Sequence, residues 1–552
     1  MGHALLSIQK LTHLFKGKKL RKDHRLKFEW LVHGWKDNPF MVVYFQGEEK
    51  LSQPYQFVVT LACQDQAIDL DKLLKAFCCL RIYQERGSSQ NFHGILSDVQ
   101  VLSNAYQQLY LQVTLVPQLW ALSLGSQCQV FLSQSLPDIL TAVLSDREKN
   151  GLCPPFMLKL MNHYEKKEFV LQYNESSLQF INRLMEQAGL YYYFEQQEKQ
   201  ELLIITDHKN SHQLPKGAKP LCYATTLAAG MVEQEQLLNQ LMVKLGHLPD
   251  KVLFKGYDPH RPAHPVMAQT KIKRPSFFAK LCQFFTKGKR VVEVPEGLGQ
   301  YYRYGEPFTQ QRQGEQLMHQ LTERLQYQAH CYQGESRVPW LTVGSLFAVE
   351  GHFLKILNQT YLLTQITHQG DQASELATPG LVTDKPRYSN TFTAIESSYQ
   401  YRPLSMTPCP NIGFLRGIID AVGSKEQAML DPQGRYKVIF PFDLADKQAG
   451  KASHWLTLAQ PFSGSKGGMH CPLCKGTEVI IAFFEGDPDR PFILSTIPNV
   501  DNPSVVNEKN AGVNKWCSRA DNELCLDDTA GKQSITLSSK NNTITLGDIK
   551  FG

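Results

Sequence analysis

The stretch Pro472–Asn499 reads PLCKGTEVIIAFFEGDPDRPFILSTIPN and decides the fold of the C-terminal part of the chain. Its apolar run Val479–Phe484 predicts a strand that is covered on both faces. The run Gly486–Pro491 is rich in turn-forming residues, and a second apolar run, Phe492–Ile497, follows it. The pattern therefore predicts a hairpin of two buried strands.

Two upstream segments predict further strands of the same domain. Gly434–Asp443 alternates apolar and basic side chains, which is the period of a half-buried strand, and His454–Gln460 is another strand candidate. Four or five short strands in so short a stretch indicate a small barrel. The positions that we expect to define its structural motif are Gly434, Arg435, Gly476, Glu478, Gly486, Asp487, Pro488, Asp489, Arg490 and Pro491.

The order of these motifs resembles the VgrG spike family of type VI secretion systems, in the OB-like domain that it shares with contractile-phage spikes. Other motifs agree with the family in the same order along the chain. They are Gly47–Phe57, Phe92–Gly94 with the letters FHG, Val116–Trp120 and Glu168–Phe194. Such collinearity is more specific than any single motif.

The resemblance implies a mainly β fold: two hub-type β-barrels with packed helices, an OB-fold barrel, and a C-terminal trimeric triple-stranded β-helix, or prism. We expect a basic N-terminal extension over 1–25 and the double-barrel region over 26–400, with an inserted basic segment at about 265–296. The OB-fold domain is expected over 401–500, and the beginning of the needle over 501–552.

Length and composition are consistent with a large folded protein that is made in a reducing compartment. The 552 residues, 42% of them hydrophobic, suffice for three or four domains with their own cores. No apolar run is long enough to span a membrane, and Met1–Leu20 lacks the pattern of a signal peptide. The 13 cysteines, with Cys78 and Cys79 adjacent, do not look like a disulfide framework. We therefore expect assembly in the cytoplasm.

The net charge of +6 is unevenly distributed along the chain. Eight basic residues and one acid lie between Lys10 and Lys27, which is a pattern that can bind nucleic acid or membranes. We favour a solvated extension, because no readout motif accompanies the charge. The basic segment Lys271–Arg290 also contains phenylalanines, and we interpret it as an inserted surface helix, touching a neighbouring subunit.

Helices interrupt the strands in the N-terminal two thirds. Ser135 is a plausible cap for a helix over 137–144, and Ser176 with Gln179 forms a capping box for a second helix that Gly189 ends. A third helix carries leucines at 317, 321 and 325. The remaining apolar runs predict strands, among them 341–352 and 359–368.

Residues that could support catalysis or metal binding have simpler structural interpretations. His93, His352 and His368 lack partners at a recognisable spacing. Cys471 and Cys474 have the spacing of a zinc knuckle, but Cys517 and Cys525 are too far apart to supply the second pair. No catalytic motif or paired-carboxylate module is visible. We expect a protein that is not an enzyme and has no cofactor or metal.

Short repeats follow the hairpin. Ser534–Leu537 recurs as Thr543–Leu546, and Glu523–Leu526 is similar. Each copy places two apolar residues on one face, which is too little for a core within one chain. Three chains in a triangular prism would bury these faces, with Leu524, Leu526, Ile535, Leu537, Ile544 and Leu546 along the axis. The alternative is a flexible polar tail.

The resemblance implies a mechanical function. A homotrimer would cap the hexameric Hcp tube, contact baseplate proteins, carry effectors and a PAAR-type tip protein, and puncture a target membrane during injection without a signal peptide. Nucleic acid is not an expected partner, because Val479–Phe484 looks buried rather than exposed as a binding groove. A phage or tailocin baseplate hub is nearly indistinguishable by sequence, and a cell-wall hydrolase fused to a spike is a weaker alternative.

Overall fold

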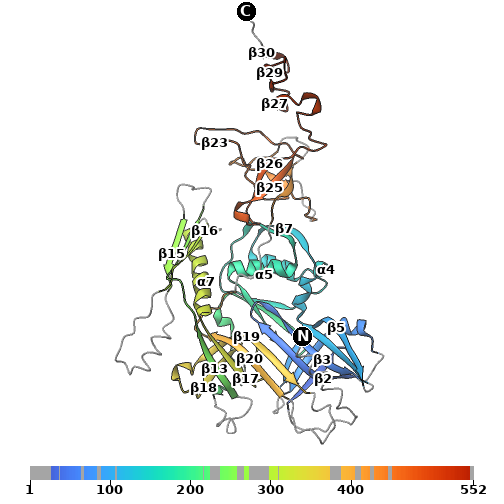
Figure 1. Ribbon diagram of the computed structural model, residues 1–552, viewed down its shortest axis with the longest axis vertical. Helices are drawn as coiled ribbons and strands as arrows, with labels where there is room; N and C mark the ends of the chain where they lie inside the picture. Colours follow the sequence, from blue (N-terminus) through green and yellow to red (C-terminus); the bar gives the residue numbers. More distant parts are fainter. Residues whose placement is uncertain are drawn as a thin grey trace, which may run out of the picture. The chain divides into compact units, whose positions relative to one another are not determined.

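The computed structural model describes residues 26–547 apart from 36–37, 64–67, 84–88, 106–107, 216, 224–236, 258–265, 273–296, 307, 309, 373–386, 404–411, 423–427 and 445–449. The basic N-terminal run up to residue 25 and most of the basic segment 271–290 therefore lie outside the described residues. The fold is mainly β, as predicted (Figure 1). Among the described residues, no helix combines the length and the hydropathy needed to cross a membrane.

The chain divides into two compact units. Unit 1 comprises Met1–Gln127, Ser135–Lys166 and Asn174–Pro408, and unit 2 comprises Cys128–Gln134, Lys167–Tyr173 and Cys409–Gly552. The four-part division predicted from the sequence is finer than this one and stays a prediction.

A twelve-stranded sheet forms most of unit 1, in the order β1-β4-β5-β6-β3-β2-β19-β18-β12-β13-β17-β20. Since β19 also pairs with β20, the last six strands in this order, from β19 to β20, hydrogen-bond in a closed ring. The strands are β1 (Lys27–Val32), β2 (Phe40–Lys50), β3 (Gln53–Cys63), β4 (Cys78–Tyr83), β5 (Ser89–Ala105), β6 (Gln108–Val116), β12 (Leu221–Tyr223), β13 (Leu237–Leu245), β17 (His330–Ser336), β18 (Leu346–Glu350), β19 (Thr360–Asp371) and β20 (Arg387–Glu396).

The core of this closed ring is aromatic and aliphatic. Tyr332, Phe347 and Tyr361 are fully buried in it, and the rings of Tyr332 and Tyr361 lie 4.7 Å apart. The predicted strand 341–352 is shorter than expected, since only Leu346–Glu350 pairs. Burial of each large side chain contributes roughly 1.5–3 kcal/mol, so this core contributes substantially to the stability of unit 1.

Two helices of unit 1 begin where the sequence predicts. Ser135 and Ser176 each accept a hydrogen bond from the backbone three residues on, and Gly189 ends the second helix in the left-handed conformation (φ 74°). These predictions are confirmed. The helices are α2 (Leu70–Leu74), α3 (Leu136–Leu144), α4 (Arg147–Asn150), α5 (Ser177–Ala188) and α7 (Gln311–Ala329), with short 3-10 turns η1 (Gln118–Ser123), η2 (Lys209–Ser211) and η5 (Lys355–Leu357).

Two small sheets complete unit 1. One is β10-β11-β8, formed by β8 (Phe156–Lys159), β10 (Tyr191–Gln196) and β11 (Glu201–Thr206). The other is β15-β14-β16, formed by β14 (Lys251–Gly256), β15 (Val266–Lys271) and β16 (Gln300–Glu306). Helix α7 packs on one face of the second sheet, where it buries Val252, Phe254 and Ala268 (Figure 1).

Unit 2 contains the domain built on the Pro472–Asn499 hairpin. Its main sheet has the order β22-β21-β25-β26, and β7 and β9 add two strands from much earlier in the chain, with Val130, Phe169 and Leu171 in the same core. The bounds are β7 (Gln127–Gln134), β9 (Lys167–Glu175), β21 (Leu415–Asp420), β22 (Lys437–Ile439), β23 (Ser463–Gly464), β24 (Gly467–Gly468), β25 (Glu478–Phe483), η6 (Phe484–Gly486) and β26 (Pro491–Thr496).

The predicted hairpin is confirmed, but two neighbouring strands were overestimated. Only Lys437–Ile439 of the predicted strand 434–443 forms a ladder. The predicted strand 454–460 is reduced to isolated bridges, because Leu456 pairs with Tyr436 whereas Leu458 pairs with Ile493. The alternating apolar residues of 454–460 therefore contact two different segments of the domain and do not form one continuous strand.

The tail of unit 2 is a separate four-stranded antiparallel sheet. Its strands follow one another in sequence order, after the turn η7 (Glu508–Asn510), as β27 (Val513–Cys517), β28 (Glu523–Asp527), β29 (Ser534–Ser539) and β30 (Asn542–Leu546). The predicted alternative of a tail without regular structure is therefore wrong for the described residues.

Candidate functional site

The tail sheet brings the six predicted axis residues onto one face. Opposite residues of an antiparallel ladder share a face, and Leu524, Leu537 and Ile544 lie opposite one another in one row. Leu526, Ile535 and Leu546 form the second row, two residues away from the first row on each strand. Trp516 of β27 lies opposite Leu524 and so extends the first row, although the sequence had not singled it out.

This apolar face is exposed in the single chain. Ile544 is 61% exposed, Leu546 58% and Trp516 56%, and Leu537 is half exposed. The opposite face carries polar groups, including Thr536, Thr545 and the ion pair between Lys515 and Glu523 (2.7 Å). A one-layer sheet with such faces cannot bury a core by itself, so the apolar face requires a partner surface.

The turn of the hairpin holds the early strand β9 to the domain. The Asp489 carboxylate accepts a hydrogen bond from the Leu171 backbone N–H (3.0 Å) and lies 3.5 Å from Lys167 Nζ. Asp487 accepts from the Asp489 N–H (3.0 Å), and burial together with the Asp489 charge raises the pKa of its carboxyl. Arg490 lies within 2.5 Å of Glu485. The acidic turn therefore positions a contact between segments 318 residues apart.

The other motif positions hold turns and strand ends of the same domain. Gly434, Gly476 and Gly486 all have positive φ, which explains the use of glycine in these turns. Arg435 pairs with Asp431 (2.6 Å), and the Asn499 side chain donates to Glu478 (2.9 Å). Pro488 lies within the turn, and Pro491 begins β26 opposite Phe483. These residues thus form separate turns and strand ends of unit 2.

The histidine and cysteine candidates occupy separate places in the chain. Buried His368 contacts Glu49 (2.9 Å) and the Tyr388 hydroxyl (2.6 Å), and His93 Nε2 donates to the Gln197 carbonyl (3.1 Å). The His352 ring accepts from the Leu354 N–H (3.0 Å). Cys471, Cys474, Cys517 and Cys525 are free thiols. Within the described ranges, no three or more His, Cys, Asp or Glu side chains gather in a way that could hold a metal ion.

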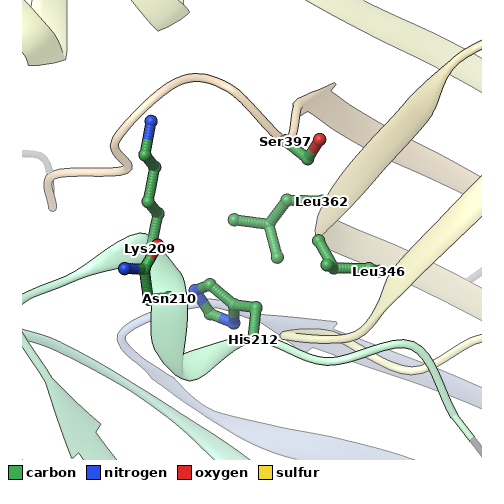
Figure 2. A pocket seen from close by; sticks show the side chains of 6 residues that line it. All are labelled: Lys209, Asn210, His212, Leu346, Leu362 and Ser397. Carbon is green, nitrogen blue, oxygen red and sulfur yellow. The ribbon is translucent and has the colours of Figure 1, made fainter.

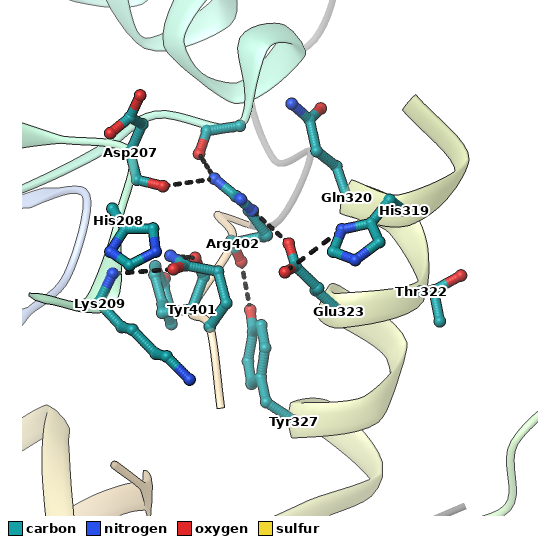
Figure 3. Close-up of polar contacts among 12 residues, drawn as sticks. Asp207, His208, Lys209, His319, Gln320, Thr322, Glu323, Tyr327, Tyr401 and Arg402 are labelled. Carbon is teal, nitrogen blue, oxygen red and sulfur yellow. Dashed lines mark hydrogen bonds and ion pairs between the residues drawn. The ribbon is translucent and has the colours of Figure 1, made fainter. Parts of the chain in front are cut away.

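Arg402 lies at the centre of a polar cluster in unit 1 (Figure 3). Its guanidinium donates to the carbonyls of Gly189 (2.8 Å) and Asp207 (2.9 Å) and to the Glu323 carboxylate of α7 (2.7 Å). Its own carbonyl accepts from the Tyr327 hydroxyl (2.7 Å). One residue thus ties α5, β11 and α7 to the segment that contains Arg402, and sequence reasoning missed it.

A pocket of about 370 Å³ lies beside this cluster and is lined by Lys209, Asn210, His212, Leu346, Leu362 and Ser397 (Figure 2). The buried His212 ring donates from Nδ1 to the Gly344 carbonyl (2.8 Å), so its Nε2 accepts from the Tyr191 hydroxyl (2.9 Å). This neutral tautomer satisfies both nitrogens. Burial lowers the pKa of His212 to about 4, and the ring is therefore a structural group.

This histidine makes unit 1 sensitive to acid. The unfolded chain protonates His212 below about pH 6.5, whereas the folded chain does so only near pH 4, so we expect stability to fall as pH drops through that window. The loss reaches roughly 3 kcal/mol at pH 4, since each pKa unit corresponds to about 1.4 kcal/mol. Urea unfolding at pH 7 and pH 4.5 should show a smaller pH effect in H212Q. The exposed control H247Q should behave as the wild type, and an equal pH effect in H212Q would contradict the assignment.

Hub-type sheets, a small domain built on the acidic hairpin and a tail sheet with an open apolar face are the parts expected of a tail hub and spike protein. A model of the phage tail baseplate hub (GPD) family matches residues 48–374, and one of the type VI secretion system/phage-baseplate injector OB domain matches residues 425–497. The first match spans more than half of the chain, which therefore belongs to the phage tail baseplate hub family.

Relatives in sequence include VgrG spike proteins of type VI secretion systems. VgrG1b of Pseudomonas aeruginosa is 29% identical over an alignment that covers 90% of this chain and 65% of the relative. VgrG1a of the same organism is 28% identical, and the alignment covers 90% of this chain and 75% of that relative. The actin cross-linking toxin VgrG1 of Vibrio cholerae is 26% identical, and the alignment spans 45% of its length. The chain thus covers only part of these relatives.

Solved structures show the same fold. The Escherichia coli c3393 protein, a type VI secretion component, matches with a TM-score of 0.57 and 21% identity, over 85% of this chain and all of that one. A chain of the half-lidded Francisella PdpA–VgrG complex matches with a TM-score of 0.61 and 12% identity, and the match covers 99% of this chain and 90% of that one. The predicted OB domain and hub-like fold are confirmed by these findings.

Proposed function

We propose that the chain is the structural spike protein of a type VI secretion machine, and that it works as a homotrimer. The observation that carries this proposal is the apolar face of the tail sheet, which a single chain leaves exposed. Burial of each Leu or Ile side chain contributes roughly 1.5–3 kcal/mol, and three copies with six such residues each provide a substantial driving force.

A trimer buries the apolar face of the tail sheet more completely than a loose dimer would. A triangular prism places all three apolar faces on its axis, with Leu524, Leu526, Ile535, Leu537, Ile544 and Leu546 in contact with their copies. The polar opposite faces remain in water. The backbone hydrogen bonds of the strands then give the needle its stiffness, as in other strand assemblies.

Unit 1 supplies the surface that would meet the tube. The closed ring of strands around β19 supports the proposal of one barrel, and the adjoining strands β1 to β6 correspond to a second. Three chains with two such barrels each would present a six-part ring to the hexameric Hcp tube. We place the boundaries of these parts at 26–400, 401–500 and 501–552.

The cargo and the route follow from the same proposal. The complex of a Francisella VgrG with PdpA and the relative named as an actin cross-linking toxin support the carriage of effectors. This chain itself acts mechanically rather than as an enzyme, and baseplate proteins and a PAAR-type tip protein are its further partners. It assembles in the cytoplasm, leaves with the tube when the sheath contracts, and crosses the target membrane transiently.

Export from the native host tests this function. We expect the chain in the culture medium of the wild type and its absence from the medium when the sheath gene is deleted, with equal amounts inside both cells. Export that does not depend on the sheath would contradict the proposal. Copurification with phage or tailocin particles would instead assign the chain to the related baseplate hubs, whose family description it also matches.

A further inference from the structure

The outer face of the β15-β14-β16 sheet lies outside the tail face and the two barrels to which the proposed function assigns contacts. The inner face packs on α7 through Val252 and Phe254, so the alternate side chains of β14 point away from the helix. Three rows of opposite residues cross the outer face, at Lys251, Leu253 and Lys255 of β14. We call these nine positions the basic-aromatic face.

Positive charge and aromatic rings dominate this face. Lys251 lies opposite Lys271 of β15, and Lys255 lies between Met267 of β15 and Tyr304 of β16. The Lys255 ammonium is 5.9 Å from the centre of the Tyr304 ring, within reach of a cation–π contact. None of the nine positions holds an acid, and the sequence that joins β15 to β16 contains no Asp or Glu before Glu293.

The apolar groups of the face are accessible. Tyr304 is 58% exposed, Tyr302 52% and Met267 47%, although all three belong to regular strands backed by a buried core. Tyr and Met are enriched in protein interfaces, where rigid aromatic side chains serve as anchors. The strands hold these side chains at fixed spacings of about 4.8 Å across the sheet. The face is thus preorganised for a partner.

We propose that the basic-aromatic face docks an acidic surface of a partner protein that is not a second copy of this chain. A protein fits better than a bilayer, because the tyrosines and Met267 lie among lysines and do not form a continuous apolar surface that could enter the acyl region. It also fits better than nucleic acid, because the lysines act as point charges and the face lacks an arginine that could pair bidentately with phosphate.

The size of the face sets the strength of the contact. Three strands and three rows cover an area on the order of a few hundred Å², less than the ~800 Å² that each partner typically contributes to a stable complex. A single face therefore binds weakly. This step rests on the proposed trimer, in which three faces act together and raise the overall affinity through effective concentration.

Photocrosslinking in the native host tests the docking. The photoreactive amino acid p-benzoylphenylalanine replaces Tyr304 in the full-length chain, and crosslinked proteins are identified by mass spectrometry. We expect one protein with an acidic surface, and a roughly tenfold lower yield in the charge-reversed variant K251E/K255E/K271E, since opposite charges across an interface govern association. The matched control K75E/K199E/K355E reverses three exposed lysines elsewhere in unit 1 and should keep the yield.

A compensating charge reversal on the partner protein tests whether the contact is specific. Reversal of acidic residues to lysine on the identified partner should recover crosslinking to K251E/K255E/K271E. The idea is overturned if only lipid, nucleic acid or a second copy of this chain is crosslinked, if nothing is, or if the yield survives charge reversal. Light scattering of each variant reports the oligomeric state separately, so a failure of the trimer is distinguishable from a failure of docking.

Discussion

Replacement of Leu537 and Ile544 by aspartate should convert the assembled protein into single chains of 62.7 kDa. The two residues lie opposite each other on the apolar face of the tail sheet. In the proposed prism the double variant would bury six carboxylates along one axis, and unpaired buried charges cost several kilocalories per mole each even after relaxation. Light scattering of the purified variant measures the change directly.

A matched control lies on the same two strands. Thr536 and Thr545 are opposite each other on the polar face, so T536D/T545D adds the same charge to the same strands without entering the proposed axis. We expect this control to assemble as the wild type does. If both double variants assemble, or both dissociate, the apolar face is not the surface that holds the chains together.

The second large effect is expected at Arg402. R402M should lower the free energy of unfolding of unit 1 by about 3–5 kcal/mol, the usual result of removing one partner of a buried ion pair. The variant leaves the Glu323 carboxylate and the carbonyls of Gly189 and Asp207 without the guanidinium that joins them. Urea unfolding, with the hydrogen exchange of α7 as the probe, measures this loss of unfolding free energy.

Two further variants sharpen this result. E323Q keeps a hydrogen-bond acceptor for Arg402 and should cost less than R402M, while R147M, on the exposed surface of α4, should change stability by less than about 0.5 kcal/mol. A loss in R402M no larger than that in R147M would show that the cluster in Figure 3 does not hold unit 1 together.

Local patterns predicted much of the fold because their physical causes are local. The capping boxes at Ser135 and Ser176 need partners only three residues away, and the hairpin of β25 and β26 needs only two apolar runs and the turn between them. The tail repeats indicated correctly which side chains share a face, since a strand alternates with period two. What covers that face is not visible in one chain.

Contacts between distant segments could not be predicted in the same way. Asp489 meets Leu171 across 318 residues, and Arg402 meets Gly189 across 213. The residues around Asp489 and Arg402 do not distinguish these two side chains from ordinary surface residues. Trp516 was missed for a related reason, because its strand lacks the two-leucine repeat and joins the apolar row only through its pairing with Leu524.

The solution mass of the wild-type chain tests the central claim most directly. Light scattering should give about 188 kDa, three times the 62.7 kDa of one chain, and about one third of that value once residues 505–552 are removed. This result would support the trimeric spike and the role of the tail together. A monomer in both forms would contradict the account, because no second copy would then cover the apolar face.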